Sequence, residues 1–376
     1  VVIYLAQSCE RGMKKIILTS IVCFVFCTQL TQCQMIQPLP EFHVEICAPD
    51  NNYDITPVYD VIKTLEGVPA GLPYGSSSGR WGDSGSIWTS QQGTPIGADI
   101  TYYSRYEDVF YRLNIDFPSE TIKDYMERAY SAYDDRNGET QEYKRLGRRY
   151  ESGGGEAYDS FSTLVFGFAP KGMVMVWMNF GTTRIELGRY QAQILTDSAV
   201  IEKTKKKYLS TYRLSSERYD EAAKEYFLAD ASPSRWDNYR NRYNWRPEII
   251  SESPSFELLQ ILNSYYNGEV EYMLRPWVSN APYKERAVPQ EINVVWLTGK
   301  NHEVKKQAFI YLSWIKANEA FTNAGDKFDM QIKIAKNNSI QVFLNGQPFE
   351  VESIRVFDWS PSMLNGGMYK NVKKIE

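Results

Sequence analysis

The chain has 376 residues, a formal net charge of −4, 43% hydrophobic residues and 23% charged residues. This length and composition are those of a folded globular protein with a substantial core, and they exclude an intrinsically disordered chain. An acidic chain without a long basic tract is a poor nucleic-acid binder, so no nucleic-acid partner is expected. Aromatic residues reach 14%, with 27 Tyr and 9 Trp, which favours a β-rich fold.

The N-terminal segment has the pattern of an export signal. Met13 and two lysines precede an apolar stretch that is too short to span a membrane. The pattern predicts an upstream extension over residues 1–12 and a signal peptide over residues 13–33. The segment LTQC, which ends at Cys33, is similar to a bacterial lipobox and would make Cys33 the lipidated N-terminus, although Gln32 stands where that motif has a small residue. Ordinary cleavage after Cys33 is the alternative, and both interpretations predict export.

The first strand is expected where apolar residues alternate over residues 42–48. It contains Cys47, the one cysteine beyond the signal segment, which is expected to be a buried structural thiol without a disulfide. An extended segment over residues 53–65 follows. Residues 66–97 are rich in Gly, Ser and Pro, and this length predicts either a functional loop or a poorly ordered one.

After this loop, strands are expected over residues 98–104 and 107–115. A helix is expected from Ser119, at the cap position, to about Ala132. The strongest signal comes next, over residues 158–192. Three strands joined by Gly-containing turns predict an antiparallel meander there, at residues 161–168, 173–178 and 184–191. Its apolar face needs a partner layer, so the rest of the chain is expected to pack on it.

The second half of the chain mixes helix and strand signals. A lobe boundary or hinge is expected within residues 195–209, and Pro247 is expected to end a helical stretch. Asn267-Gly268 is a strong hairpin turn. The helices are expected at residues 215–228, 235–242 and about 303–321, and the strands at residues 256–262, 269–274, 291–297, 330–335, 340–344 and 349–357. The last three strands are expected to form a closing meander.

These elements predict an α+β, β-rich fold of antiparallel meander sheets packed with a few helices. Two lobes are expected: an N-terminal β-rich lobe over residues 34–200 and a C-terminal α+β lobe over residues 201–376. No internal repeat with a fixed period is visible.

Several stretches imitate catalytic motifs without their context. The run Gly75–Gly79 fits G-x-S-x-G, but it lacks the flanking strand and helix of a nucleophile elbow. The GDSG run over residues 82–85 lacks a histidine base in the required context, because the chain contains only His43 and His302. A serine hydrolase is therefore rejected.

Metal and charge motifs are equally weak. Two histidines and one internal cysteine leave little room for zinc, and no metal or other cofactor is expected. Residues 134–139 are read as a solvated turn instead of a calcium loop, and residues 203–207 as a solvated basic face. A carboxylate pair for glycoside hydrolysis stays open, because sequence supplies no distances.

Short segments in combination resemble a known family. They are Trp81-Gly82, YSRYE at 103–107, PKG at 170–172, VMVW at 174–177 and ELGRY at 186–190, with WDNYRNRYNW at 236–245 similar to a later family segment. The chain resembles a family of exported Gram-negative bacterial proteins, known as domain of unknown function 2931, many of whose members are predicted lipoproteins. The resemblance implies export and a β-rich fold, and it carries no established catalytic residue.

Three functions remain open for a protein of the periplasm or outer membrane. The first is a non-enzymatic envelope protein that binds a protein partner, with an immunity protein against a secreted toxin as a sub-case. Its expected contact residues are Tyr74, Arg80, Trp81 and Trp88, because aromatic side chains on loops suit such contacts. The second is a glycan-binding module that uses Trp81, Trp88 or Trp277 as stacking platforms. The third is a hydrolase of envelope material. Membrane contact is expected only through a lipid anchor at Cys33.

Overall fold

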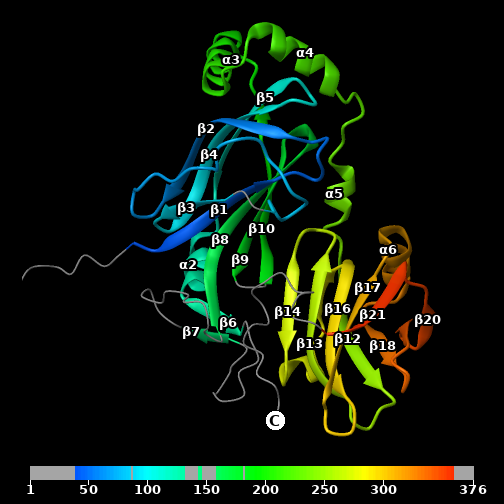
Figure 1. Cartoon of the computed structure of the whole chain (residues 1–376). Coiled ribbons are helices and arrows are strands. Elements are labelled where there is room, and N and C mark those ends of the chain that lie inside the picture. Colours follow the sequence, from blue (N-terminus) through cyan, green and yellow to red (C-terminus); the bar gives the residue numbers. More distant parts are fainter. Residues whose placement is uncertain (1–38, 86–87, 132–142, 146–157, 181–182, 360–376) are drawn as a thin grey trace, which may run out of the picture. The chain divides into compact units, whose positions relative to one another are not determined.

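The computed structural model describes residues 39–85, 88–131, 143–145, 158–180 and 183–359 (Figure 1). The chain divides into two units, Val1–Leu39 and Pro40–Glu376, and every described residue except Leu39 belongs to the second. The predicted signal segment with Cys33, and the turn at residues 134–139, lie outside the described residues. The predicted division into lobes at residue 200 stays a prediction.

The largest sheet has twelve strands and contains the predicted meander. Its main path is β21 (Ser353–Asp358), β17 (Val304–Tyr311), β16 (Pro289–Thr298), β13 (Glu257–Tyr265), β14 (Val270–Leu274), β10 (Thr183–Gln191), β9 (Met173–Phe180), β8 (Tyr158–Ala169), β1 (Glu41–Cys47) and β3 (Trp88–Gln92). Beside β8 lie β6 (Arg128–Ser131) and β7 (Tyr143–Arg145). The meander β8–β9–β10 is confirmed, with antiparallel neighbours throughout, whereas β1 joins β8 in parallel.

Two smaller sheets complete the fold. The four-stranded sheet has the order β11 (Gln193–Ile194), β5 (Val109–Asp116), β4 (Pro95–Ser104) and β2 (Ile55–Thr64). The five-stranded sheet has the order β15 (Lys284–Ala287), β12 (Arg242–Ser251), β18 (Phe328–Ile334), β19 (Ile340–Leu344) and β20 (Gln347–Phe349). The helices are α2 (Ser119–Met126), α3 (Ser198–Tyr212), α4 (Ser216–Tyr226), α5 (Ser234–Asn238) and α6 (Trp314–Asn323), with short 3-10 turns η1 (Pro170–Gly172) and η2 (Trp277–Asn280). The predicted β-rich α+β class is confirmed.

The first core forms where the four-stranded sheet faces β1, β8 and β9. Alternate residues of each strand point inward, among them Val44, Ile100, Leu164, Phe166 and Val176, and all are fully buried. Successive side chains of a strand point to opposite faces, and in β8 and β9 the other face, with Val165, Met175 and Trp177, is buried as well. A separate aromatic cluster joins α3 and α4 to the outer face of the four-stranded sheet through Tyr103, Phe110, Tyr208 and Tyr219.

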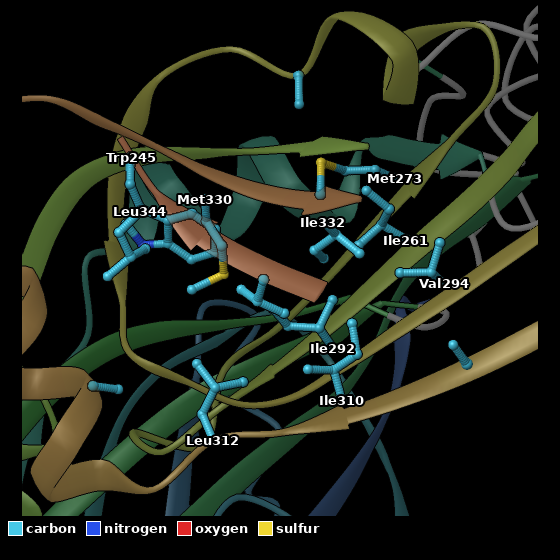
Figure 2. Packing of buried hydrophobic residues seen from close by; sticks show 14 of the residues in the cluster. Trp245, Ile261, Met273, Ile292, Val294, Ile310, Leu312, Met330, Ile332 and Leu344 are labelled. Atoms are coloured by element: carbon cyan, nitrogen blue, oxygen red, sulfur yellow. The ribbon is translucent and has the colours of Figure 1, made fainter. Parts of the chain in front are cut away.

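The second core lies between the five-stranded sheet and strands β13, β16 and β17. Figure 2 shows apolar side chains from both sheets pointing toward one another, including Trp245 of β12, Ile261 of β13, Ile310 of β17 and Met330 of β18. Trp245 and Trp296 are completely buried. Burial of side chains this large dominates the stability of such a core.

The predicted helix over residues 303–321 is wrong in its first half. Residues Val304–Tyr311 form β17, which pairs with β16 and β21, and only Trp314–Asn323 are helical. Val304, Ala308 and Leu312 lie four residues apart, a spacing that also keeps side chains on one face of a strand. Backbone pairing with β16 on one edge and β21 on the other stabilises this segment as a strand. β21 therefore joins the large sheet, and only β18, β19 and β20 form the closing meander.

The two ends of α2 differ from the prediction, whereas the predicted hinge stays a prediction. α2 begins at Ser119 with Pro118 at its cap position, and it ends at Met126 because β6 follows and pairs with β8. The expected hinge region contains α3, whose cap Asp197 accepts hydrogen bonds from the N–H groups of Ala199 and Val200. Tertiary pairing and side-chain capping outweigh the composition signals used to place these boundaries.

The Asn267-Gly268 hairpin between β13 and β14 and the helix capped by Ser215 are confirmed. The predicted helix at residues 235–242 shrinks to α5. Pro247 does not end a helix, because it lies inside strand β12. Strand β12 tolerates this proline because one of its edges is only partly paired, and the candidate site lies along that edge.

Candidate binding groove

Strand β12 has one paired edge and one edge that is only partly paired. Along one edge it runs parallel to β18 from Trp245 to Ser251. Along the other edge it pairs with β15 only from Arg242 to Trp245. Beyond Trp245, none of the described strands pairs with this second edge.

The hydrogen bonds to β18 fix which residues face the open edge. The N–H of Glu252 donates to the carbonyl of Ile334 at 3.0 Å, in register with the Ser251–Ile334 pair. In a parallel pair, alternate residues direct both backbone groups to the same neighbour. Even-numbered residues of β12 therefore bond to β18, and Pro247, Ile249 and Ser251 direct their backbone groups to the open edge. Proline is tolerated in a strand at such a position, because no ladder bond needs its missing N–H.

A groove of about 660 Å³ lies along this open edge. One wall is residues 246–250 of β12, and the others are residues 256–258, 275–276 and 278–281. Leu258, Val278 and Ala281 supply an apolar floor and are each less than one-tenth exposed. The volume falls within the range of ordinary ligand sites.

Charged side chains line the same groove, and neighbours hold them in place. The Arg246 guanidinium donates to Asp329 at 2.6 Å, and the Gln331 amide donates to Glu248 at 2.8 Å. The hydrogen bond to Asp329 raises the pKa of Arg246 above its ordinary value. The groove therefore presents a cation and an anion two residues apart on one strand.

Another part of the groove lining, at Glu257 and Arg275, carries a second charge pair. Glu257 pairs with Arg275 through one carboxylate oxygen. Its other oxygen lies 2.9 Å from Nδ1 of His302. A carboxylate bonded on both oxygens keeps a fixed orientation, which favours recognition over proton transfer.

The four residues predicted as contacts lie against different elements. Tyr74 is 73% exposed and stacks on Tyr212 of α3 at 5.2 Å. Trp88 is 56% exposed and packs on His43 of β1 at 4.6 Å. Arg80 is exposed beside Asp83 at 3.9 Å. No ring contact joins Tyr74 to Trp88 among the described residues, and their role in binding stays a prediction.

Trp81 is turned inward. Its ring meets Trp177 of β9 edge-on at 5.1 Å and Trp236 of α5 at 6.2 Å. Gly167 makes this packing possible, because a Cβ there would lie 2.5 Å from the Trp177 ring and 2.9 Å from the Trp81 ring. Trp81 therefore anchors the loop on the large sheet.

The anchored loop also closes over Cys47 and Arg184. The Gly82 N–H donates to the Cys47 sulfur at 3.3 Å, and burial raises the pKa of the thiol to about 12. The buried, structural thiol expected from the sequence is confirmed, since a thiol with this pKa is a poor nucleophile at neutral pH. Arg184 donates to the carbonyl of Gly268 at 3.1 Å, which connects β10 to the β13–β14 hairpin.

The motif-like serines also have structural roles. In the G-x-S-x-G run, the Ser77 hydroxyl accepts a hydrogen bond from the N–H of Ile55 at 3.1 Å. The Ser84 hydroxyl donates to Glu45 at 3.0 Å. Within the described part of the chain, no cluster of three or more His, Cys, Asp or Glu side chains could hold a metal ion.

None of the residues predicted as contacts lines the groove, although one feature of the sequence indicates the open edge. A proline inside a run of strand-forming residues indicates an edge position, and Pro247 lies between Trp245 and Ile249. The prediction that Pro247 ends a helical stretch is therefore wrong. Residues 275–276 and 278–281, which line the groove beside that edge, are about 30 positions away in sequence. Their position next to β12 could not be inferred from the sequence.

Comparison with known proteins identifies the family. The model of the family described as protein of unknown function (DUF2931) matches residues 28–234, more than half of the chain. The chain belongs to this family. No curated protein and no solved structure matches it. The matched region ends before β12, so the groove lies outside the part that defines the family.

No helix in the described part of the chain has the length and apolar character that crossing a bilayer demands.

Proposed function

We propose that this protein is exported to the envelope of a Gram-negative bacterium and acts there as a non-enzymatic binding protein whose partner is another protein. The observation that carries the proposal is the groove beside the open edge of β12. Export is supported by the basic and apolar residues that begin at Met13 and by the cysteine at position 33. A secreted toxin is one partner of this kind, and a toxin gene beside the gene for this chain would support that case.

The chemistry of the groove favours a macromolecule over a small metabolite. Its lining combines free backbone groups of β12 with side chains of both charges. Arg246 and Glu248 are held by Asp329 and Gln331 before any partner arrives. Such preorganised charges favour specificity, because a partner without complementary groups would leave them desolvated.

A site-specific crosslink tests the proposal. Ile250 lines the groove and is 38% exposed, whereas Ile315 on α6 is 75% exposed and outside it. We expect p-benzoylphenylalanine at position 250, in living cells, to form a discrete protein adduct on irradiation. The same group at position 315 is the matched control and should form none. Absence of an adduct at position 250, or equal adducts at both positions, would contradict the proposal.

Hydrolysis of an envelope glycan is a second candidate, because two carboxylates, Glu248 and Glu257, line one groove. Glycoside hydrolysis uses such a pair, one as proton donor. Hydrolysis is the weaker of the two proposed functions, because the Glu257 carboxylate is already bonded to Arg275 and His302. Release of reducing ends from purified cell-wall glycan, abolished in both Glu248→Gln and Glu257→Gln, would support it. No release by the unaltered protein would remove it.

A further inference from the structure

The open edge of β12 has unused backbone hydrogen-bonding groups. By the alternation described above, the carbonyl of Pro247 and the N–H and carbonyl of Ile249 point away from β18. Strand β15 pairs with this edge of β12 only as far as the Trp245–Lys284 pair. Residues 278–281, which precede β15 in the chain, also line the groove. Beyond the Trp245–Lys284 pair, no described strand occupies the place next to this edge of β12.

We infer that the partner of this protein binds as an added β-strand, with an extended peptide segment paired to residues 247–251 of β12 in the groove. This inference rests on the proposed function and specifies its ligand. Free N–H and C=O groups spaced along a strand are matched by an extended backbone, whereas a helix has its backbone groups already bonded internally.

The side chains around the edge define the kind of peptide. Even-numbered residues of β12 lie on the outer face of the five-stranded sheet, where Arg246 meets Asp329 and Glu248 meets Gln331 across β18. Odd-numbered residues lie on the core face, as buried Trp245 does. A paired peptide alternates in the same way.

The inner side chains of such a peptide would face the apolar floor of Leu258, Val278 and Ala281. Its outer side chains would lie beside Arg246 and Glu248. Opposite charges directly across a strand pair stabilise it, and like charges destabilise it. The peptide class is therefore an alternating apolar and charged segment, with an acidic and a basic residue two positions apart.

Pro247 removes one hydrogen-bond donor from the open edge of β12 but leaves its other backbone groups able to pair. Proline on an edge strand removes one donor and guards against unwanted pairing with other chains. Ile249 still offers both of its backbone groups. The edge is therefore selective for a short peptide that the groove walls also contact.

The test starts from a random library of linear 12-residue peptides displayed on phage, selected on the full chain. The tightest peptide is then synthesised with single backbone N-methyl groups at successive positions, and each Kd is measured by fluorescence anisotropy. We expect N-methylation to weaken binding at least tenfold at alternate positions and less than about twofold at the positions between them.

Two variants of β12 provide the matched comparison. Ile249→Pro removes the N–H on the open edge without touching the bonds to β18, and Ile249→Val keeps it. We expect a loss of tenfold or more only for the proline variant. Because Ile249 packs against the second core, thermal melts set the temperature at which both variants are folded and their binding is compared. Pro247→Val adds a donor to the edge and should tighten binding severalfold, a gain that misfolding could not produce.

The outcomes separate this inference from the proposed function. If N-methylation has no two-residue period, or Ile249→Pro binds as tightly as Ile249→Val, the added strand is overturned. The crosslink from position 250 then still decides whether the groove binds a protein. If no crosslink forms and no selected peptide binds, both proposals fail.

Discussion

The loop around Trp81 and the groove beside β12 differ in what their polar groups contact. Beneath the loop, the Cys47 sulfur of β1 and the Arg184 side chain of β10 are enclosed. The Cys47 sulfur accepts a hydrogen bond from the Gly82 N–H, and Arg184 donates one to the Gly268 carbonyl. In the groove, the backbone of Ile249 points to an edge that no described strand occupies. The loop looks like a binding surface in sequence, and the groove does not. Enclosure of polar groups, more than aromatic content, therefore separates the structural region from the candidate binding region.

Truncation of Trp177 should have the largest effect on stability. This side chain is fully buried, packs against Trp81, and donates from Nε1 to the carbonyl of Asn267 at 3.2 Å. We expect Trp177→Ala to lower the free energy of unfolding by about 4 kcal/mol, measured in urea. The matched variant in the groove is Ile250→Ala, whose side chain is partly exposed and should matter far less. Equal losses would remove the distinction between the two regions.

A buried carboxylate should make the second core sensitive to acid. Burial alone would raise the pKa of Glu271, but Lys284 and Arg286 outweigh it and lower the pKa from 4.5 to about 2. The folded protein therefore binds this proton more weakly than the unfolded chain. The stabilisation is fully present above pH 4.5 and is lost as pH falls toward 2, a change of about 3 kcal/mol.

Urea unfolding between pH 7 and pH 2.5 measures this dependence. In Glu271→Gln, we expect lower stability at pH 7, because Lys284 and Arg286 lose their partner, and a flatter decline below pH 4.5. If the unfolding free energy of Glu271→Gln falls below pH 4.5 as steeply as that of the unaltered protein, other carboxylates cause the loss of stability in acid.

Closure of the loop over Cys47 depends on Gly82. Its φ is +86°, and a Cβ would lie 2.7 Å from the Gly268 carbonyl oxygen. We expect Gly82→Ala to cost about 2 kcal/mol of unfolding free energy. Gly85→Ala is the control in the same loop, since it has a φ of +79° and no atom within 4 Å of the added Cβ. It should cost only the backbone strain, about 1 kcal/mol. Faster alkylation of Cys47 in Gly82→Ala, located by mass spectrometry, would report the opened loop.

The exposed aromatic residues should matter least for stability. Trp88→Ala and Tyr74→Ala remove side chains that are more than half exposed, and each should change the unfolding free energy by less than about 1 kcal/mol. Crosslinking from position 250 should also be unaffected if the groove is the binding site. Loss of the crosslink in a folded Trp88→Ala variant would instead restore the aromatic loop as the contact surface.

Sequence by itself determined the elements whose signals are local. The meander β8–β10 and the Asn267-Gly268 hairpin were predicted because alternation and turn residues act between near neighbours. Alternation along β1 did not decide the burial of Cys47, because Phe42, Val44 and Ile46 face the first core and Cys47 lies on the opposite face of the strand. The family was visible in short segments of the N-terminal half.

Only the tertiary structure decided the features that depend on distant partners. Val304–Tyr311 became a strand because β16 and β21 lie on either side of it, although its spacing also suited a helix. Trp81 turned inward because Gly167, 86 positions later, leaves room for its ring. The open edge of β12 exists because β15 stops opposite Trp245, and no property of residues 246–251 alone could reveal where that neighbour ends.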